Sequence, residues 1–310
     1  MTHTVPTFTV ITPTYNRAGT LPRVHSSLAN QTFRDFEWVI VDDGSTDDTR
    51  ELVQAWQSSG WPPIRYVILP TNGGILAARN RGVAEATGRF VLFHDSDDMC
   101  VPNALERFNF HWESIPAQER TNFVGVTAQC VYQTGEPVGP SLPTSPLDSN
   151  SLEMSYRYRL RGEMWGIQRT DVLRQHPFPS DRGAVEGVVW FAIARRYRTR
   201  YVQDQLRVYY VDEPARRDQF HHMAPRDVAG GAALSHAVIL DQAGDWLRYD
   251  PVSFARSAAH YVRFSLHEQR SIPSMVSGVK TPVAQLLVLA GLPVGAIAYL
   301  QDRRAERRAA

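Results

Sequence analysis

The 310-residue chain carries 33 basic and 32 acidic side chains, and this near balance argues against bulk nucleic-acid binding, which needs a strong basic excess. Apolar residues make up 43% of the sequence and charged residues 21%, a globular composition that excludes a disordered chain. Cys100 and Cys130 cannot build a disulfide framework and form no CxxC zinc pair, so we expect a reducing compartment. The N-terminus lacks the charged and apolar pattern of a signal peptide, which predicts a cytoplasmic protein.

The first hundred residues alternate short apolar strands with helical patterns. Strands are expected at 8–11, 36–41, 64–69 and 90–93, and helices at 20–29, 45–57 and 75–86. Ser45 or Thr46 is the expected cap of the second helix, and Gly88 lies where the third should stop. Strands and helices that alternate through short connections predict an α/β fold with a mostly parallel sheet and flanking helices.

The pattern becomes mixed after about residue 121. A strand is expected at 124–132, a loop rich in Pro, Ser and Gly at 135–150, a helix at 185–197, and one or two strands at 201–210. Beyond residue 212 the sequence is mainly helical in pattern. We therefore predict an α/β domain at 1–212 and a helical C-terminal extension at 213–310.

Polar residues follow three of the predicted strands. They occupy Thr12–Arg17, Asp42–Ser45 and Asp95–Asp98. Ligands of open α/β sheets bind beyond the carboxyl ends of the strands, so these three segments should converge on one site.

The acidic run Asp95-Ser96-Asp97-Asp98 places carboxylates in a tight turn after a strongly apolar strand. Such side chains repel one another unless a cation lies between them, and hard oxygen ligands suit Mg²⁺ or Mn²⁺ bound together with phosphate. The alternative is a solvated turn that precedes the helix expected near Pro102.

Two other segments could contact a nucleotide. Asp42 and Asp43 could accept hydrogen bonds from a nucleobase imide or a ribose, or could form only a turn and a helix cap. Arg79 and Arg81 could contact a diphosphate or base, or could lie on a solvated helix face. The loop at 72–74 contains two glycines, which allow a ligand to approach the backbone closely.

Taken together, four segments resemble the family 2 glycosyltransferases, a large inverting family with the Rossmann-like GT-A fold. They are Val10–Arg17, Gln31–Phe33 with Glu37–Ser45, Asn72–Gly74 with Ala78–Gly82, and Gly88–Asp98. Their order and spacing are more specific than any one motif. The resemblance covers about the first 110 residues well and weakens towards residue 212.

The resemblance implies a role for each matching residue. Thr14 and Tyr15 would line the base pocket, with Thr12 nearby, and Asp43 would bind the nucleobase, most often uracil. Asp97 would bind the metal, Asp95 would contact the ribose or sugar and could also be a metal ligand, and Asp98 would be a further or indirect ligand. The remaining expected nucleotide-binding residues are Pro13, Arg17, Asp42, Arg79 and Ser96.

The expected general base departs from the family pattern. Many members carry Glu-Asp at the start of a downstream helix, whereas this chain has Glu186-Gly187. We assign the base to Glu186, because an acceptor hydroxyl must lose a proton as it attacks the anomeric carbon. Asp181 is the fallback, and the alternative for Glu186 is that it only charges the helix N-terminus. Trp190 could stack on an acceptor sugar, although core packing is its simpler role.

Residues 282–300 contain no charged side chain and are flanked by basic ones. Pro293 and two glycines interrupt this segment, so an in-plane or re-entrant anchor on an anionic membrane surface fits it better than a full span. The alternative is a helix pair that packs on the protein or on a partner subunit.

The predicted function is metal-dependent transfer of a sugar from a nucleoside diphosphate, with UDP favoured, to a hydroxyl acceptor such as a glycan or lipid-linked saccharide. Mn²⁺ or Mg²⁺ is the expected cofactor, and no nucleic-acid partner is expected. Two alternatives stay open: a degenerate subunit that binds nucleotide sugar in a synthase complex, and a nucleotidyltransferase. The pair His221–His222 is interpreted as exposed rather than metal-binding.

Overall fold

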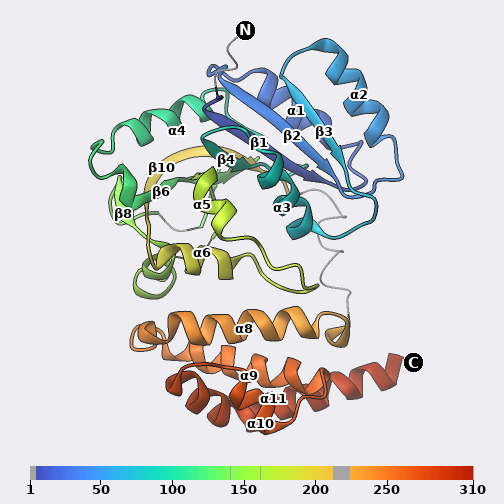
Figure 1. The fold of residues 1–310 in the computed structure, drawn as a ribbon, viewed down its shortest axis with the longest axis vertical. Coiled ribbons are helices and arrows are strands. Elements are labelled where there is room, and N and C mark those ends of the chain that lie inside the picture. Colours follow the sequence, from blue (N-terminus) through green and yellow to red (C-terminus); the bar gives the residue numbers. More distant parts are fainter. Residues whose placement is uncertain (1–4, 140, 161, 212–223, 310) are drawn as a thin grey trace. The chain divides into compact units, whose positions relative to one another are not determined.

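The computed structural model describes residues 5–139, 141–160, 162–211 and 224–309, which form two compact units (Figure 1). The first unit contains Met1–Asn150, Leu160–Phe178 and Arg196–Asp212, and the second contains Ser151–Arg159, Pro179–Arg195 and Glu213–Ala310. The predicted boundary at 212–213 and the pair His221–His222 lie outside the described residues. No single cut separates the units, because two internal segments pack with the C-terminal helices.

One mixed sheet organises the first unit. Its main order is β3-β2-β1-β4-β9-β6-β10-β5, with β7 paired to β6 and β8 to β10. The strands are β1 (Phe8–Thr14), β2 (Phe36–Asp42), β3 (Ile64–Ile68), β4 (Phe90–Phe93), β5 (Met99–Cys100), β6 (Phe123–Tyr132), β7 (Pro137–Val138), β8 (Leu147–Ser149), β9 (Met164–Arg169) and β10 (Arg198–Tyr209).

The predicted α/β fold is confirmed, with a mixed rather than a mostly parallel sheet. β3, β2, β1 and β4 are parallel neighbours, as the alternating pattern predicted. β9 then runs antiparallel to both β4 and β6. The prediction of a loop throughout 135–150 was wrong in part, because β7 and β8 pair with longer strands there.

Helices flank the sheet of the first unit (Figure 1). They are α1 (Leu21–Ala29), α2 (Thr49–Ser59), α3 (Ile75–Glu85), α4 (Ala104–Glu113), the 3₁₀ turn η1 (Arg120–Asn122) and α5 (Thr170–Gln175). α2 begins later than predicted, because the Asp47 carboxylate accepts hydrogen bonds from the backbone and hydroxyl of Thr49. The expected caps Ser45 and Thr46 instead contact the loop that follows β1.

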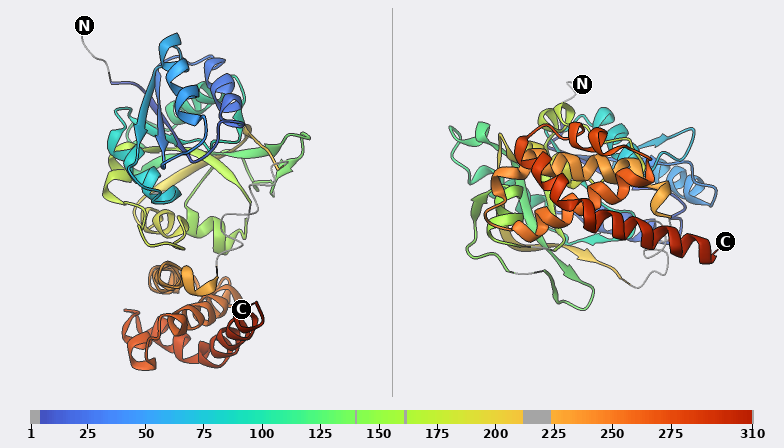
Figure 2. Two further views of the ribbon diagram at one scale, coloured as in Figure 1. Left: turned by 90° about the vertical axis from the view of Figure 1, so that its right-hand side faces the viewer. Right: turned by 90° about the horizontal axis from the view of Figure 1, so that it is seen from below.

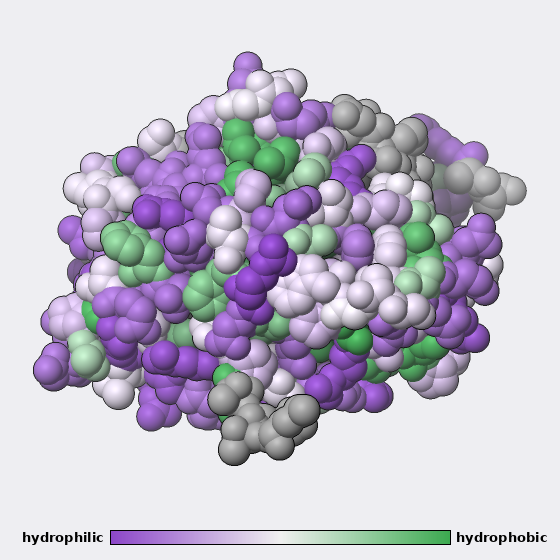
Figure 3. Space-filling view, turned by 90° about the horizontal axis from the view of Figure 1, so that it is seen from above, coloured by the Kyte–Doolittle hydropathy of each residue, from purple (hydrophilic) through white to green (hydrophobic). Residues whose placement is uncertain are grey.

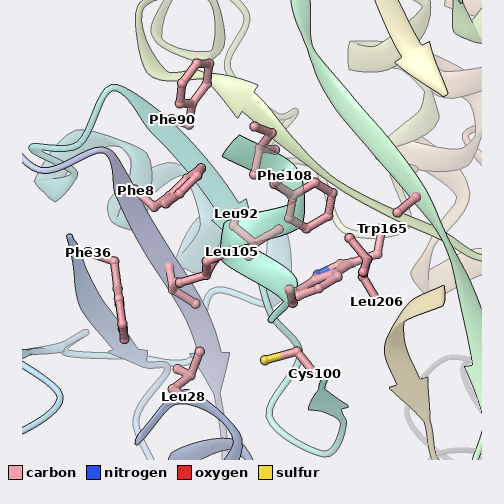
Figure 4. Close-up of a cluster of buried hydrophobic side chains, with 14 of the residues drawn as sticks. Phe8, Leu28, Phe36, Phe90, Leu92, Cys100, Leu105, Phe108, Trp165 and Leu206 are labelled. Carbon is pink, nitrogen blue, oxygen red and sulfur yellow. The ribbon is translucent and has the colours of Figure 1, made fainter. Parts of the chain in front are cut away.

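The parallel strands bury side chains on both faces. On one face, aromatic and aliphatic residues form a continuous core; Figure 4 labels Phe8, Leu28, Phe36, Phe90, Leu92, Cys100, Leu105, Phe108, Trp165 and Leu206. On the other face α3 lies close to β1, because Gly82 has no side chain. A Cβ atom there would lie 2.4 Å from Cγ2 of Ile11. This close approach sets the position of α3 relative to the strand ends.

The second unit is helical. It contains the π-helical turn η2 (Glu153–Arg157), α6 (Gly187–Ala194), η4 (Pro225–Asp227), α8 (Ala229–Ala243), η5 (Gly244–Trp246), α9 (Pro251–His267), α10 (Ile272–Ser277) and α11 (Pro282–Ala309). Its core includes buried side chains from α8, α9, α10 and α11. α11 packs along α9 and is seen from below in the right panel of Figure 2. The predicted helix at 185–197 is shorter than expected and corresponds to α6.

Candidate active site

The loops that follow β1 and β2 are joined by hydrogen bonds. The backbone N–H of Asn16 donates to Oγ of Ser45 at 2.9 Å, and Oδ1 of Asn16 accepts the N–H of Thr46 at 2.8 Å. Asn16 has φ of 52°, a left-handed conformation that asparagine tolerates better than most residues. The predicted convergence of these two segments is therefore confirmed.

The acidic turn after β4 is attached to the same region. Oγ1 of Thr20 donates to the carbonyl of Ser96 at 2.8 Å, and Nη1 of Arg23 donates to the carbonyl of Asp97 at 2.8 Å. Thr20 and Arg23 lie at the start of α1, directly after the β1 loop. All three polar segments thus lie along one edge of the sheet.

The neighbouring aspartates after β2 make different contacts. Asp42 accepts the backbone N–H of Ser45 with Oδ1 at 2.7 Å and a short hydrogen bond from the Tyr66 hydroxyl with Oδ2. Burial raises the pKa of Tyr66, and the Asp42 carboxylate raises it further, so the phenol stays a donor. Both oxygens of Asp42 therefore shape the turn, and its predicted nucleotide contact stays a prediction.

Asp43 holds the glycine loop that precedes α3. Its Oδ1 accepts the N–H of Gly73 and its Oδ2 accepts the N–H of Gly74, each at 2.7 Å. Gly74 has φ of 85°, which favours glycine because a Cβ would strain this conformation. Since α3 begins at the next residue, the carboxylate of Asp43 also sets where this helix starts.

The end of β1 contains two threonines with different surroundings. Oγ1 of Thr12 accepts a hydrogen bond from the Trp38 indole at 2.9 Å inside the core. Oγ1 of Thr14 is buried and has no hydrogen-bond partner among the described residues. Thr14 thus has hydrogen-bonding capacity for a ligand, whereas the hydroxyl of Thr12 is already used. The other expected nucleotide-binding residues of this segment are buried or half-buried: Pro13, Tyr15 and Arg17.

α3 links the Asp43 loop to the acidic turn through Arg79. Nη2 of Arg79 lies 3.6 Å from Oδ1 of Asp95, and the guanidinium lies over the rings of Phe93 and Phe178. Arg79 therefore lies beside the acidic turn, and its expected place near the nucleotide stays a prediction. By contrast, Arg81 forms an exposed pair with Glu85, as expected for a solvated helix face.

A second guanidinium enters the cluster from β10. Nη2 of Arg207 donates to Oδ2 of Asp95 at 2.5 Å, and its Nε donates to Oδ2 of Asp98 at 2.6 Å. Oδ1 of Asp98 accepts the backbone N–H of Tyr210 at 3.0 Å. Both carboxylate oxygens of Asp98 are therefore engaged by protein groups, and the geometry disfavours its assignment as a metal ligand.

The charge states of this cluster follow from its pairing. Burial pushes the pKa of Asp95 upward, but Arg207 and Arg79 outweigh it and hold that pKa well below its usual range. Burial lowers the pKa of Arg207, but Asp95 and Asp98 more than compensate and raise it. Burial, with a contribution from Arg207, lowers the pKa of His94 to about 4, so His94 is neutral at pH 7. Asp95 is therefore ionised and already held by two arginines of the protein.

Comparison with known proteins decides the family. The family model for glycosyl transferase family 2 matches residues 9–163, which include all three polar segments. The chain belongs to glycosyl transferase family 2. The uncharacterised glycosyltransferase YibD of Escherichia coli is 29% identical over 215 residues, covering 65% of this chain and 60% of the relative.

A second relative of this family 2 glycosyltransferase is the GalNAc(5)-diNAcBac-PP-undecaprenol beta-1,3-glucosyltransferase of Campylobacter jejuni. It is 25% identical over 212 residues, covering 67% of this chain and 65% of the relative. The chain thus spans somewhat less than two thirds of the length of these two relatives.

Solved structures support the fold. Residues 1–349 of Staphylococcus aureus TarS in complex with UDP-GlcNAc match 97% of this chain and 92% of theirs, with a TM-score of 0.63 and 21% identity. The mannosyltransferase PcManGT of Pyrobaculum calidifontis, in complex with GDP-Man and Mn²⁺, matches 97% and 88%, with a TM-score of 0.55 and 20% identity. At these identities the likeness shows the fold alone, and that fold is GT-A.

The acidic turn fits a divalent cation shared with a ligand. Among the described residues, no group of three or more His, Cys, Asp or Glu side chains could hold a metal ion by itself. Mg²⁺ and similar ions commonly bind through one or two carboxylates together with substrate phosphates. Arg207 holds Asp95 and Asp98, and Asp97, at 5% exposure, lies between them in the sequence of the turn. The assignment of the cation to Asp97 stays a prediction.

The expected general base lies in the second unit. Glu186 directly precedes α6, is half-buried, and makes no side-chain capping hydrogen bond to that helix. The fallback residue Asp181 is exposed, and its carbonyl accepts the N–H of Ala184. The carbonyl of Trp190 accepts a hydrogen bond from Ser151 within the same unit. Both predicted roles of Glu186, as general base and as a charge at the helix N-terminus, stay predictions.

Our reading of the sequence missed Arg207, Arg23 and Tyr66. Arg207 stands between Leu206 and Val208 in β10, directly after the polar run Gln203–Gln205. Side chains alternate between the two faces of a strand, so this pattern predicts an exposed arginine and gives no local signal of its burial. Its partners lie 109 and 112 residues away, which local patterns cannot reveal.

Proposed function

We propose that this chain is an inverting glycosyltransferase that moves a sugar from a UDP-sugar to a hydroxyl group of a glycan or lipid-linked saccharide. The observation that carries the proposal is the chain of contacts from Asp43 through the glycine loop and α3 to Arg79 and Asp95. These contacts bring the Asp43 carboxylate, which we expect to accept the nucleobase, and the acidic turn to one edge of the sheet. The UDP-GlcNAc complex of TarS and the name of the Campylobacter relative support this donor and acceptor class.

Donor binding follows from the groups at this edge. The carboxylate of Asp43 accepts the imide N–H of uracil in addition to its two glycine N–H groups, since an ionised carboxylate has about four acceptor positions. Oγ1 of Thr14 supplies a further hydrogen bond to the nucleoside. The guanidinium of Arg79 contacts the diphosphate side while Asp95 keeps it in place.

The Asp97 carboxylate binds Mn²⁺ or Mg²⁺ together with the donor diphosphate. When bound, the cation neutralises charge on the departing UDP. The Mn²⁺ complex of PcManGT supports a divalent cation in this fold. The protein contributes a turn whose backbone is already held by Thr20 and Arg23 before the donor arrives.

Glu186 acts as the general base on the acceptor. It takes the hydroxyl proton as the acceptor oxygen forms a bond to the anomeric carbon, while the bond from that carbon to the diphosphate oxygen breaks on the opposite face. Inversion follows from this single displacement. Such a base typically contributes about 10²- to 10⁴-fold in rate.

A direct test of the donor site is calorimetric titration of UDP into the full chain with and without Mn²⁺. The proposal expects binding that Mn²⁺ strengthens, and Asp97→Asn should lose that gain while the fold is kept. Unchanged Mn²⁺ dependence in the variant would remove the metal assignment. Incubation with UDP-GlcNAc and Mn²⁺ should release UDP, whereas pyrophosphate formation from UTP and a sugar 1-phosphate would instead indicate a nucleotidyltransferase.

The base is tested by slow hydrolysis of the donor, in which water replaces the unknown acceptor. Glu186→Gln should lower hydrolysis about 100-fold or more with UDP affinity unchanged. Asp181→Asn is the matched carboxylate-to-amide control and should keep the wild-type rate; the opposite pattern would move the base to Asp181. If the wild type binds UDP tightly but never turns over, the chain is instead a degenerate binding subunit.

The C-terminal helix supports a peripheral membrane contact in the same proposal. The buried face of α11 packs closely on α9, because a Cβ at Gly295 would lie 2.6 Å from the carbonyl oxygen of Ala259. Asp302 of α11 also pairs with Arg263 of α9 through two hydrogen bonds of 2.6 and 2.7 Å. These contacts favour a helix that stays with its unit over an isolated membrane span.

The opposite face of α11 is apolar and exposed. Only 22% of the most apolar 18-residue window of the helix is buried, although the helix is long and apolar enough to cross a membrane by length and composition. The exposed apolar residues are Val283, Leu286, Leu289, Val294, Ile297 and Leu300. The molecular face in Figure 3, in contrast, is largely hydrophilic with separate apolar spots. Lys280 and four exposed arginines flank the apolar row: Arg303, Arg304, Arg307 and Arg308.

We assign this face to an anionic lipid surface, on which α11 lies in the plane of the membrane. The enzyme would then act at the cytoplasmic face of a membrane, within reach of a lipid-linked acceptor. Leu286→Glu with Ile297→Glu should abolish sedimentation with phosphatidylglycerol vesicles, while Val252→Glu on α9 should not. If the double variant still binds vesicles, the assignment is refuted. It is also refuted if the wild type binds no vesicles and the double variant converts a dimer to a monomer.

A further inference from the structure

Arg207 joins the two ends of the acidic turn. Its side chain is 4% exposed and lies on β10, next to Cys100 of β5 and Cys130 of β6 in the strand register. Its guanidinium contacts Asp95 through Nη2 and Asp98 through Nε, with a further close contact from Nη2 to Asp98. One planar group therefore bridges two carboxylates that are three residues apart in sequence.

Asp97 lies between these two carboxylates. The backbone of the turn has its own attachments, because Thr20 and Arg23 hold the carbonyl groups of Ser96 and Asp97. These bonds fix the path of the chain but leave the charges of the flanking carboxylates uncompensated. Arg207 supplies that compensation, together with Arg79 on the other oxygen of Asp95.

We propose that Arg207 is a positioning residue for donor binding: it holds Asp95 and Asp98 in place and thereby fixes the orientation of the turn that presents Asp97 to the cation and diphosphate. The inference rests on the proposed function and deepens it. Three carboxylates in four residues would otherwise compete for one cation and repel the diphosphate. With Asp95 and Asp98 held, one orientation of the turn is selected before the donor binds.

The geometry requires arginine rather than lysine. Arginine presents several N–H donors in a rigid plane and can serve two carboxylates at once, whereas an ammonium group is a single point of charge. Arg207→Lys therefore keeps the charge and removes the bridge. Arg207→Met removes both, and Arg207→Met combined with Asp98→Asn also removes the buried charge that the single substitution would leave.

β10 contains a matched control. Arg200 is 8% exposed and binds Asp148 through two hydrogen bonds, from Nε at 2.8 Å and from Nη2 at 2.7 Å. It lies on the same strand and makes the same kind of buried pair, but Asp148 belongs to β8 and not to the acidic turn. Arg200→Met thus reproduces the structural cost of losing a buried arginine without touching the turn.

The experiment is calorimetric titration of UDP into the full chain at several Mn²⁺ concentrations, with thermal melting of every variant. We expect Arg207→Met, and its combination with Asp98→Asn, to weaken the apparent Mn²⁺ affinity in the UDP complex about 10- to 100-fold, the usual effect of losing a residue that orients a metal ligand. Arg207→Lys should recover only part of this loss. Arg200→Met should lower the melting temperature and leave the Mn²⁺ dependence unchanged.

The outcomes separate this inference from the proposed function. If the wild type shows no Mn²⁺-dependent UDP binding, the proposed function and the role of Arg207 are both refuted. If the wild type binds as expected but the Arg207 variants match Arg200→Met in Mn²⁺ dependence, Arg207 is only structural and this inference alone is overturned. Full recovery by Arg207→Lys would also overturn it, because charge without the bridge would then suffice.

Discussion

Replacing Asp43 with alanine separates its effect on the fold from its effect on the ligand. The carboxylate accepts two backbone N–H groups at 2.7 Å, from Gly73 and Gly74. An N–H left without a partner costs about 1–3 kcal/mol when it is shielded from water. Gly73 is exposed and Gly74 is half-buried, so water reaches both and the lower end applies. We expect a loss of about 2 kcal/mol in the free energy of unfolding, or about 4–8 °C in melting temperature.

The expected effect on ligand binding is of similar size. A hydrogen bond to a charged acceptor contributes about 1.5–3 kcal/mol, which corresponds to UDP binding about 10- to 100-fold more weakly in Asp43→Ala. The assay is calorimetric titration of UDP alongside thermal melting. Glu37→Ala is the control, because Glu37 lies at the opposite end of β2 and its Oε1 accepts three hydrogen bonds from Thr9 and Thr87. If UDP affinity falls no further in Asp43→Ala than in Glu37→Ala, Asp43 does not bind the nucleobase.

Three further predictions concern stability and reactivity. Gly295→Ala should destabilise the second unit by up to about 2 kcal/mol in urea titrations, because overpacking against the α9 backbone costs about 1–3 kcal/mol and the helix propensity of alanine returns only about 1 kcal/mol. Burial pushes the pKa of Asp302 upward, but hydrogen bonds and charge from Arg263 and His267 together outweigh it and hold that pKa below its ordinary value. The stability from this pair is therefore complete above about pH 4 and lost as the pH falls further, and Asp302→Asn should remove this acid-sensitive part from melting curves. Burial raises the pKa of the Cys100 and Cys130 thiols to about 12, so neither should react with a disulfide reagent at pH 8 until the protein is denatured.

The parallel half of the sheet could be predicted because its signals are local. Four short apolar runs, each pair separated by a helix, form β1, β2, β3 and β4. This pattern brings the carboxyl ends of the strands together, however the rest of the chain folds. The three polar segments were therefore found with nearly correct bounds. The shift of the start of α2 from Ser45 to Thr49 shows the limit of such reasoning, since Ser45 has a partner in another loop.

The mixed half of the sheet depends on pairings that local patterns do not contain. β10 pairs with strands from three earlier parts of the chain, and its two buried arginines find partners in different turns. Asp98 illustrates the consequence. The sequence alone suggests that Asp98 is another acidic ligand. Only the folded structure shows that Arg207 and the backbone of Tyr210 already bind its two carboxylate oxygens.

Asp97 has two possible roles, as a cation ligand or as a residue that only shapes the turn. They predict different changes in the metal-free UDP affinity of Asp97→Asn. If its carboxylate binds the cation beside the diphosphate, then without metal it lies near the phosphates as a like charge and weakens UDP binding. Asp97→Asn should then bind UDP without Mn²⁺ at least as tightly as the wild type, while losing the gain that Mn²⁺ gives. If Asp97 only shapes the turn, both affinities should fall together, because a distorted turn also misplaces Asp95 and through it Arg79. UDP titration in the presence of a chelator therefore separates a charge effect from a structural one: a fall in metal-free affinity would refute the metal-binding role even if activity were lost.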